Sequence, residues 1–184
     1  STIVSDYIIT ANEVIVDAGL NVYICEGESA QLDAIGNSSM YIWEPANTLS
    51  SHNINNPQAN PTTSIIYYVH HSDGICSATD SILVNVYNDV PIASFTASNL
   101  CYGDLTYFEA NSGLLNNNNN NNYMWNFSQN GPVVSSMLNI GNNNITLIIE
   151  NLNNNCKDTL VQNVEISANP IAEFSSSNNN LCLG

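Results

Sequence analysis

Apolar residues along this chain alternate with polar ones in short runs, and turn residues separate the runs. A period of two is typical of β-strands that bury one face, and helical periodicity is absent. In the first half the runs are Val14–Val16, Ala30–Ala34, Tyr41–Trp43, Ser64–His70 and Ile82–Tyr87. In the second half they are Ile92–Phe95, Thr106–Ala110, Tyr123–Phe127, Met137–Ile140, Ile145–Glu150 and Leu160–Ile166. Asp73-Gly74 is a hairpin-turn signal, and many short strands at this spacing predict antiparallel β-sandwiches.

The chain also repeats itself. The stretch Cys-Glu-Gly-Glu at 25–28 recurs as Cys-Tyr-Gly-Asp at 101–104, and Cys182 begins the pattern again. The period is 76 residues (101 − 25) and then 81 (182 − 101), and Trp43 and Trp125 end matching Tyr-x-Trp triplets. Self-similarity at a fixed period indicates an array of repeated units. Each unit is long enough to be a small domain.

Recurring junctions divide the chain into four segments. We expect residues 1–13 to be the last strand of a preceding repeat plus a linker, and 14–88 to be the first repeat. The second repeat is expected at 89–168, and the start of a third at 169–184. The linkers are short and twice contain proline, which restricts the backbone. The sequence therefore predicts an elongated, semi-stiff array.

The cysteines recur in register with the repeats. Pairing Cys25 with Cys76 and Cys101 with Cys156 would close loops of 51 (76 − 25) and 55 (156 − 101) residues, one per domain. Cys182 is then left unpaired in this fragment. Domains this small need such cross-links, which belong to oxidising compartments. Connectivity cannot be deduced from sequence alone, and the alternative is unpaired buried thiols in a cytosolic protein.

Asparagine runs are expected in loops. From Ala34 to Trp43 is nine residues (43 − 34), but from Ala110 to Trp125 is fifteen (125 − 110), and the extra six fall in the homopolymer 116–122. This run therefore predicts a lengthened surface loop in the second repeat. The clusters 142–144, 153–155 and 178–180 also fall where loops are expected.

The charge balance is strongly acidic. The 184 residues hold 16 acidic side chains against one basic one, Lys157, for a formal net charge of −15. Nucleic-acid binding is excluded because it needs lysine or arginine to neutralise phosphates. No run approaches the roughly 18 apolar residues of a membrane span.

No catalytic constellation is visible. His52 lies in a polar stretch, and His70 and His71 are adjacent on a predicted strand, where they face opposite sides. We therefore expect no enzyme, no cofactor and no metal site. Single acids that could supply oxygen ligands are Glu26, Glu28, Asp73, Asp80 and Asp104. We interpret them as a solvated acidic surface, with structural calcium as the alternative.

Trp43 and Trp125 lie in the middle of predicted strands. Exposed, they could be platforms on which sugars stack. Aromatic residues in such triplets more commonly pack in the core, and we predict that both are core aromatic residues.

Three stretches of the first repeat carry a resemblance. They are residues 24–28 (ICEGE), 41–45 (YIWEP) and 73–76 (DGIC), which resemble the PKD-like and Ig-like repeats of giant cell-surface proteins of Bacteroidota, including gliding-motility adhesins. In the second repeat, residues 123–130 (YMWNFSQN) are similar to the PKD motif Tyr-x-Trp-Asp-Phe-Gly-Asp-Gly, without its acidic and glycine positions.

The resemblance implies tandem β-sandwich domains exported by the type IX secretion system to the cell surface. The implied function is a non-enzymatic stalk, filament or adhesive segment in attachment or gliding. The implied partners are neighbouring repeats of the same chain, surface glycans or other cells, and secretion machinery or filament subunits. The alternative is a carbohydrate-binding or accessory module of a secreted enzyme, which would need exposed aromatic residues on one face.

One further expectation depends on this resemblance, and another follows from the spacing of the cysteines. Ser81 and Thr159 each follow an aspartate and precede an apolar residue, which fits the O-glycosylation pattern of Bacteroidota proteins. The alternative is that each hydroxyl fixes a turn where a strand begins. Neither Cys25 nor Cys76 is mid-strand, so the bridge predicted between them should lie near a domain edge, unlike the core disulfide of immunoglobulin domains.

Overall fold

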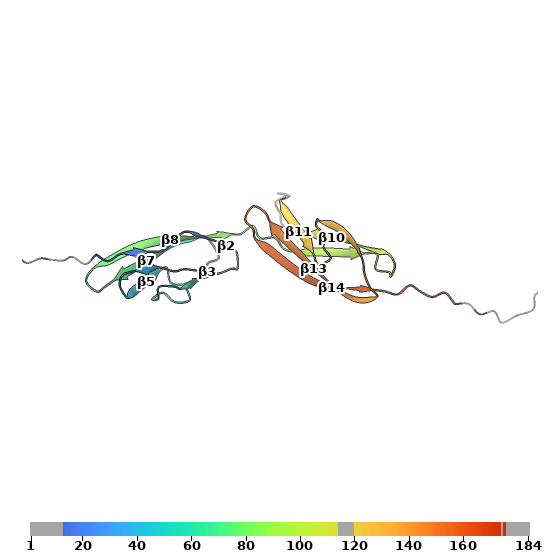
Figure 1. Ribbon diagram of the computed structural model, residues 1–184, viewed down its shortest axis with the longest axis horizontal. Coiled ribbons are helices and arrows are strands. Elements are labelled where there is room, and N and C mark those ends of the chain that lie inside the picture. Colours follow the sequence, from blue (N-terminus) through green and yellow to red (C-terminus); the bar gives the residue numbers. More distant parts are fainter. Residues whose placement is uncertain (1–12, 114–119, 174, 176–184) are drawn as a thin grey trace, which may run out of the picture. The chain divides into compact units, whose positions relative to one another are not determined.

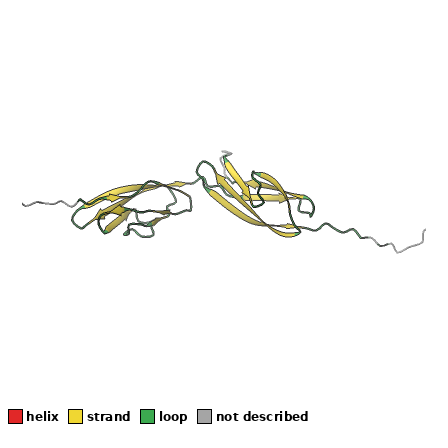
Figure 2. Cartoon of the chain, in the orientation of Figure 1, coloured by secondary structure: helices red, strands yellow, loops and turns green. Residues whose placement is uncertain are grey.

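A computed structural model describes residues 13–113, 120–173 and 175. All regular elements in these residues are β-strands, and none of the residues lies in a helix (Figure 2). The described part of the chain therefore holds no helix that could cross a membrane. The prediction of an all-β chain with antiparallel sheets is confirmed. Cys182 and most of the two predicted terminal segments lie outside the described residues.

The chain divides into two compact units, Ser1–Val90 and Pro91–Gly184, which we call domain 1 and domain 2. Each has its own hydrophobic core. The junction expected from the sequence lay between residues 88 and 89.

Domain 1 contains a four-stranded sheet and two short two-stranded ladders (Figure 1). Its strands are β1 (Val16–Asp17), β2 (Val22–Cys25), β3 (Ala30–Gln31), β4 (Ile35–Gly36), β5 (Met40–Glu44), β6 (Gln58–Ala59), β7 (Ile65–Ser72) and β8 (Ser77–Tyr87). The larger sheet has the order β2-β8-β7-β5, and the ladders are β1-β4 and β3-β6. All pairs are antiparallel except β2 with β8, which are parallel.

Domain 2 contains two three-stranded sheets, in the orders β12-β10-β9 and β11-β13-β14. Its strands are β9 (Ser94–Ser98), β10 (Leu105–Asn111), β11 (Asn121–Trp125), β12 (Val133–Met137), β13 (Gly141–Asn151) and β14 (Lys157–Ile166). A single parallel bridge between Cys101 and Ser167 takes the place of the β2-β8 ladder.

The two domains share one strand order. In immunoglobulin lettering, strands A, B and E form one sheet, and C, F and G form the other. The segment after strand A crosses over and pairs in parallel with strand G, as β2 does with β8. Both domains are therefore Ig-like sandwiches without a paired D strand among the described residues.

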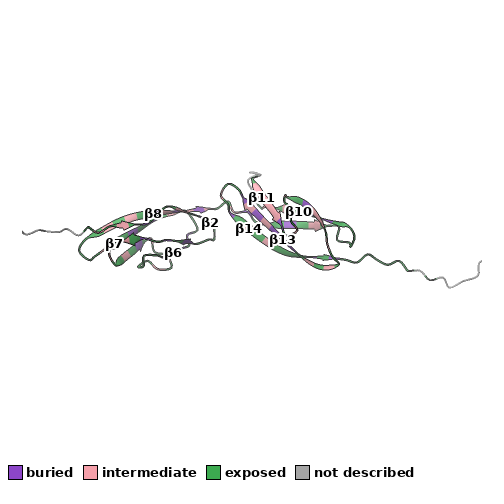
Figure 3. Ribbon diagram, in the orientation of Figure 1, coloured by how far each residue is buried: buried purple, intermediate pink, exposed green. Residues whose placement is uncertain are grey.

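Inward-facing residues of the two sheets form each core, and burial alternates along the strands (Figure 3). Trp43 is fully buried in domain 1, and its Nε1 donates to the carbonyl of Ile54 at 2.9 Å. Trp125 is 5% exposed, and its Nε1 donates to the carbonyl of Gly131 at 3.0 Å. Each ring thus buries its apolar surface while its only donor is satisfied. The prediction that both are core residues is confirmed.

Tyr67 on β7 is a second buried anchor in domain 1. Its hydroxyl lies 2.5 Å from Oγ1 of Thr48. Burial raises the pKa of Tyr67, and the hydrogen bond with Thr48 partly opposes that increase. A tyrosine at the start of strand F that bonds to an upstream loop is also a feature of immunoglobulin sandwiches.

Two sequence expectations about strands are wrong. The run Met137–Ile140 is not a strand; the strand is β12, which ends at Met137. Strand β2 was not expected, and its parallel pairing with β8 departs from a purely antiparallel sheet. Its alternation is short, and its pairing comes from a strand about 60 residues later, from Val22 to Val84. Local periodicity does not encode such a distant partner.

Asparagine proved compatible with strands as well as turns. Residues 142–144 lie in β13, and Asn121 and Asn122 lie in β11 opposite Asn151 and Glu150, so the loop expectation is wrong there. Apolar residues further along β13 set its register, and backbone pairing extends the ladder regardless of the polar side chains. The cluster 153–155 is in a turn, as expected, whereas residues 116–119 and 178–180 lie outside the described residues.

An aspartate near the start of the last strand holds the entering chain in each domain. Oδ2 of Asp80 accepts the backbone N–H of Ala18 at 2.8 Å in domain 1. Oδ2 of Asp158 accepts the backbone N–H of Ala93 at 2.7 Å in domain 2. Both alanines are buried, so these carboxylates satisfy amides that the sheets do not pair.

We predict that Asp80→Ala and Asp158→Ala each lower the free energy of unfolding of their own domain by about 1–3 kcal/mol, because each leaves an amide unsatisfied. Urea unfolding of the full chain measures the effect. Asp33→Ala and Glu165→Ala remove exposed carboxylates and serve as controls, with changes within about 0.5 kcal/mol. If Asp80→Ala and Asp158→Ala lowered the free energy of unfolding no more than the two control variants do, this structural role of the aspartates would be contradicted.

Candidate functional site

The four described cysteines occupy two kinds of position. Cys25 and Cys156 are disulfide-bonded, whereas Cys76 and Cys101 are exposed free thiols. The predicted pairings Cys25–Cys76 and Cys101–Cys156 are therefore wrong, because each contains one free thiol. A disulfide within each domain is not what the described residues form.

The physical reason is distance along the last strand of each domain. Cys25 lies opposite Tyr87 at the end of β8, while Cys76 directly precedes that strand, eleven residues earlier (87 − 76). In domain 2, Cys101 pairs with Ser167, again eleven residues (167 − 156) beyond the hairpin cysteine. Eleven extended residues span about 36 Å, whereas disulfide-bonded Cα atoms lie less than about 7 Å apart. The two cysteines of one domain cannot meet.

The two hydroxyl residues singled out from the sequence are accessible. Ser81 on β8 and Thr159 on β14 are both exposed, and each is preceded by the aspartate that clamps its domain's entry segment. The aspartate of the Asp-Ser/Thr pattern thus has a structural role of its own. The hydroxyls themselves lie within strands rather than at their first residue.

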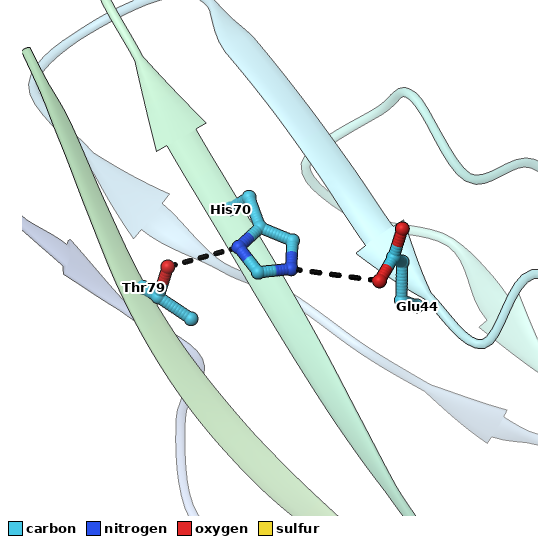
Figure 4. Close-up of polar contacts among 3 residues, drawn as sticks. All are labelled: Glu44, His70 and Thr79. Atoms are coloured by element: carbon cyan, nitrogen blue, oxygen red, sulfur yellow. Dashed lines mark hydrogen bonds and ion pairs between the residues drawn. The ribbon is translucent and has the colours of Figure 1, made fainter.

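A polar cluster lies on the outer face of the four-stranded sheet. The imidazole of His70 on β7 lies between Thr79 on β8 and Glu44 on β5 (Figure 4). Nδ1 of His70 is 2.9 Å from Oγ1 of Thr79, and Nε2 is 3.8 Å from Oε2 of Glu44. The sequence singled out His70 but not Glu44 or Thr79. Glu44 lies 26 residues earlier (70 − 44) and Thr79 lies 9 residues later (79 − 70), and cross-strand pairing brings both to His70.

This cluster contains a hydroxyl, an imidazole and a carboxylate, as a hydrolytic triad does, but not in working geometry. The carboxylate distance exceeds that of a hydrogen bond, so Glu44 does not orient the ring. The side chains of His70 and Glu44 are 45% and 68% exposed, and water therefore screens their attraction. The arrangement is a surface polar network.

His71, the neighbour of His70, faces the other way, as expected for adjacent strand residues. It is fully buried, and its Nε2 accepts the backbone N–H of Ser38 at 2.7 Å. The ring of Tyr41 packs on it at 4.4 Å between centroids. Nδ1 has no hydrogen-bond partner within the described part of the chain. A Cβ at Gly36 would come within 2.6 Å of Nε2, so only glycine leaves room for this ring.

The acidic residues do not gather. In the described residues no three His, Cys, Asp or Glu side chains lie together in a way that could hold a metal ion. Several acids bind backbone amides instead. Oε2 of Glu28 accepts the N–H of Cys25 at 3.0 Å, and Oδ1 of Asp73 accepts those of Ile75 and Cys76 at 2.9 and 2.7 Å.

Several exposed apolar side chains lie on the outer face of the four-stranded sheet. They come from three strands, and two of the larger ones are tyrosines. They are Tyr23 on β2, Met40 and Ile42 on β5, and Ile66 and Tyr68 on β7. Antiparallel sheets in water commonly present polar residues on the outer face. These exposed apolar side chains lie on the same face as the polar cluster of Glu44, His70 and Thr79, and exposed apolar groups of this kind can contact another surface.

Comparison with known proteins identifies no family: no family model matches the chain, and no curated protein does. Similar solved structures include the fibronectin(III)-like modules of Clostridium thermocellum CbhA, at 11% identity and a TM-score of 0.39 over 90% of this chain and 100% of that chain. Extracellular domains 3–5 of Drosophila OTK are similar at 7% identity and a TM-score of 0.45, over 86% of this chain and 62% of that chain. The amphioxus IgVJ-C2 molecule is similar at 11% identity and a TM-score of 0.34, over 79% of this chain and 100% of that chain.

These scores and identities are low, and the assignment of the fold rests on the strand order of each domain. The chain is a pair of tandem Ig-like domains. The disulfide-bonded Cys25 and Cys156 are consistent with an oxidising, extracellular environment.

We predict that the pKa of Asp73 lies below the ordinary aspartate value, because backbone N–H groups of Cys76 and Ile75 stabilise its charged form. Carbon-13 NMR titration of the carboxyl group measures it. A lowered pKa means that this contribution to stability is present above the ordinary value and is lost as the pH falls through the folded-state pKa. Asp73→Asn keeps an acceptor oxygen but should remove this pH dependence. An Asp73 pKa at or above the ordinary value would contradict the prediction.

Proposed function

We propose that the chain is a non-enzymatic stalk or adhesive segment of a repetitive extracellular surface protein. The observation that carries the proposal is how the backbone passes through each domain. In domain 1 the chain enters beside Asp80, near the start of β8, and leaves at Tyr87, where β8 ends. In domain 2 it enters beside Asp158 and leaves at Ile166. Entry and exit therefore lie at opposite ends of each domain, which suits a domain that serves as a spacer within a longer chain.

Composition and cysteine chemistry support an extracellular location. Disulfides such as those of Cys25 and Cys156 persist in oxidising compartments. A net charge of −15 keeps a surface protein soluble and repels nucleic acid. Lys157, the single basic residue, is 3.1 Å from Glu150, so even this cation is paired.

The finer reading follows the resemblance to Bacteroidota repeats. We propose export by the type IX secretion system, a role in attachment or gliding, and O-glycans on Ser81 and Thr159. Both hydroxyls are exposed, which glycosylation requires. The proposed partners are neighbouring repeats of the same chain, with surface glycans, other cells, secretion machinery or filament subunits as outer contacts.

We predict that an antibody raised against the 184-residue chain labels intact cells of the native source as strongly as permeabilised cells. Mass spectrometry of peptides from the native protein, cut with elastase because there is one basic residue, should show hexose on Ser81 and Thr159. The recombinant chain made in a host without this glycosylation is the matched control. Label confined to permeabilised cells would overturn the extracellular assignment, whereas bare hydroxyls would overturn only the glycosylation.

A carbohydrate-binding module is the second candidate, and one observation favours it. Tyr23 and Tyr68 are exposed on the same face of the four-stranded sheet, where sugars could stack on their rings. Trp43 and Trp125, the stronger stacking residues, are buried and do not take part.

Calorimetric titration with cellohexaose and a pull-down with insoluble cellulose separate the two functions. Under our proposal the chain binds neither, and Tyr68→Ala changes nothing. Binding that is lost in Tyr68→Ala and retained in Tyr107→Ala, which removes a comparably exposed tyrosine of domain 2, would favour the carbohydrate-binding module.

A further inference from the structure

Each domain carries one cysteine at each end of its last strand, and the two kinds of position are built alike in the two domains. We call Cys25 and Cys101 the exit cysteines, because they lie beside the end of the outgoing strand. We call Cys76 and Cys156 the hairpin cysteines, because they close the turn before that strand.

The exit cysteines share a backbone setting. In both, the next residue donates its N–H to the outgoing chain, and the N–H three positions after the cysteine returns to the cysteine's own carbonyl. In domain 1, the N–H of Glu26 donates to the carbonyl of Tyr87 and the N–H of Glu28 donates to that of Cys25, both at 2.9 Å. In domain 2, the N–H of Tyr102 donates to the carbonyl of Ser167 at 2.9 Å, and the N–H of Asp104 donates to that of Cys101 at 3.3 Å. Cys101 is thus held as Cys25 is.

The hairpin cysteines also share a setting. In both, the cysteine's N–H is bonded to a side-chain oxygen of the turn, and its carbonyl accepts an N–H from the end of the preceding strand. In domain 1, the N–H of Cys76 donates to Oδ1 of Asp73 at 2.7 Å, and the N–H of Asp73 donates to the carbonyl of Cys76 at 3.2 Å. In domain 2, the N–H of Cys156 donates to Oδ1 of Asn154 at 2.9 Å, and the N–H of Asn151 donates to the carbonyl of Cys156 at 2.8 Å.

One cysteine of each kind is disulfide-bonded, and one of each kind is a free, exposed thiol. Cys25 and Cys156 show that each kind of position can hold a disulfide, and the length of the last strand separates the exit cysteine of a domain from its hairpin cysteine. Both positions are therefore suited to bonds that leave the domain, and the two free thiols are of complementary kinds.

We propose that Cys101 and Cys76 form disulfides with the opposite kind of cysteine on another domain of this repeat type, which a second copy of the chain supplies in solution. The array is then cross-linked from domain to domain, head to tail, rather than within domains. This inference rests on the proposed function in that it needs tandem domains in oxidising surroundings.

The bond forms by thiol–disulfide exchange with a small disulfide such as oxidised glutathione. The Cys101 thiolate attacks one sulfur of that disulfide and releases one glutathione thiolate. The Cys76 thiolate of the second copy then attacks the Cys101 sulfur of the mixed disulfide and releases the other. Two cysteine thiols are oxidised, one glutathione disulfide is reduced to two thiols, and the two protons pass to the released thiolates.

The test uses the full chain carrying Cys182→Ser, so that the fifth cysteine does not compete. In this background we compare Cys76→Ser, which keeps Cys101, with Cys101→Ser, which keeps Cys76. Each is incubated alone and in an equimolar mixture in a glutathione redox buffer, then alkylated and analysed by non-reducing electrophoresis and mass spectrometry. Near-ultraviolet circular dichroism checks that both variants are folded.

We expect each variant alone to stay monomeric with its thiol accessible to alkylation, and the mixture to give a dimer containing the Cys76–Cys101 peptide. As the control, the double variant Cys76→Ser/Cys101→Ser replaces either partner in the mixture, and this dimer should then not form. Homodimers of either variant at the level of the mixed dimer, or no dimer in folded material, would overturn the inference. Neither result depends on where the protein is located in the cell, so the surface labelling remains a separate test of the proposed function.

Discussion

The pairing of the outgoing strand on both of its sides is the constraint on which each domain depends. In domain 1, β8 pairs antiparallel with β7 on one side and parallel with β2 on the other, and its inward residues enter the core. Its side chains also hold the entry segment, through Asp80. Domain 2 uses β14 in the same way, with Asp158 at its start and a single bridge from Ser167 at its end. One strand therefore sets the core, the entry point, the exit point and the positions of both cysteines.

The sequence predicted the repeat, the all-β class and the burial of Trp43 and Trp125, because these depend on local alternation and on copies of one pattern. It did not predict the cysteine connectivity. Recurrence in register shows that cysteines have equivalent positions, but not whether partners lie in the same domain or in another. The separation of Cys25 from Cys76 follows from the pairing of β2 with the far end of β8, which no local pattern encodes. The expectation that the asparagine cluster 142–144 lies in a loop is wrong for a related reason: backbone hydrogen bonds extend the ladder, and the type of side chain does not reveal them.

The chemistry of the surface also emerges from pairing rather than from motifs. Glu44, His70 and Thr79 come from three strands, and only the sheet brings them together. Their exposure leaves them as a polar network beside an apolar face, whereas the buried His71 is fixed by the backbone of Ser38 and by the space that Gly36 leaves. The two adjacent histidines thus have different roles: His70 is exposed to solvent, and His71 packs in the interior of the domain.

The parallel pairing of β2 with β8 has a mechanical consequence. A pull on the two ends of domain 1 draws these neighbouring strands in opposite directions along their length, so it shears the ladder rather than unzipping it. The four residue pairs from Val22–Val84 to Cys25–Tyr87 then bear the load together. In domain 2 the corresponding contact is the one bridge between Cys101 and Ser167. Under equal tension the load at this junction falls on fewer residue pairs in domain 2, so this contact should rupture at a lower pulling force than the β2-β8 ladder of domain 1.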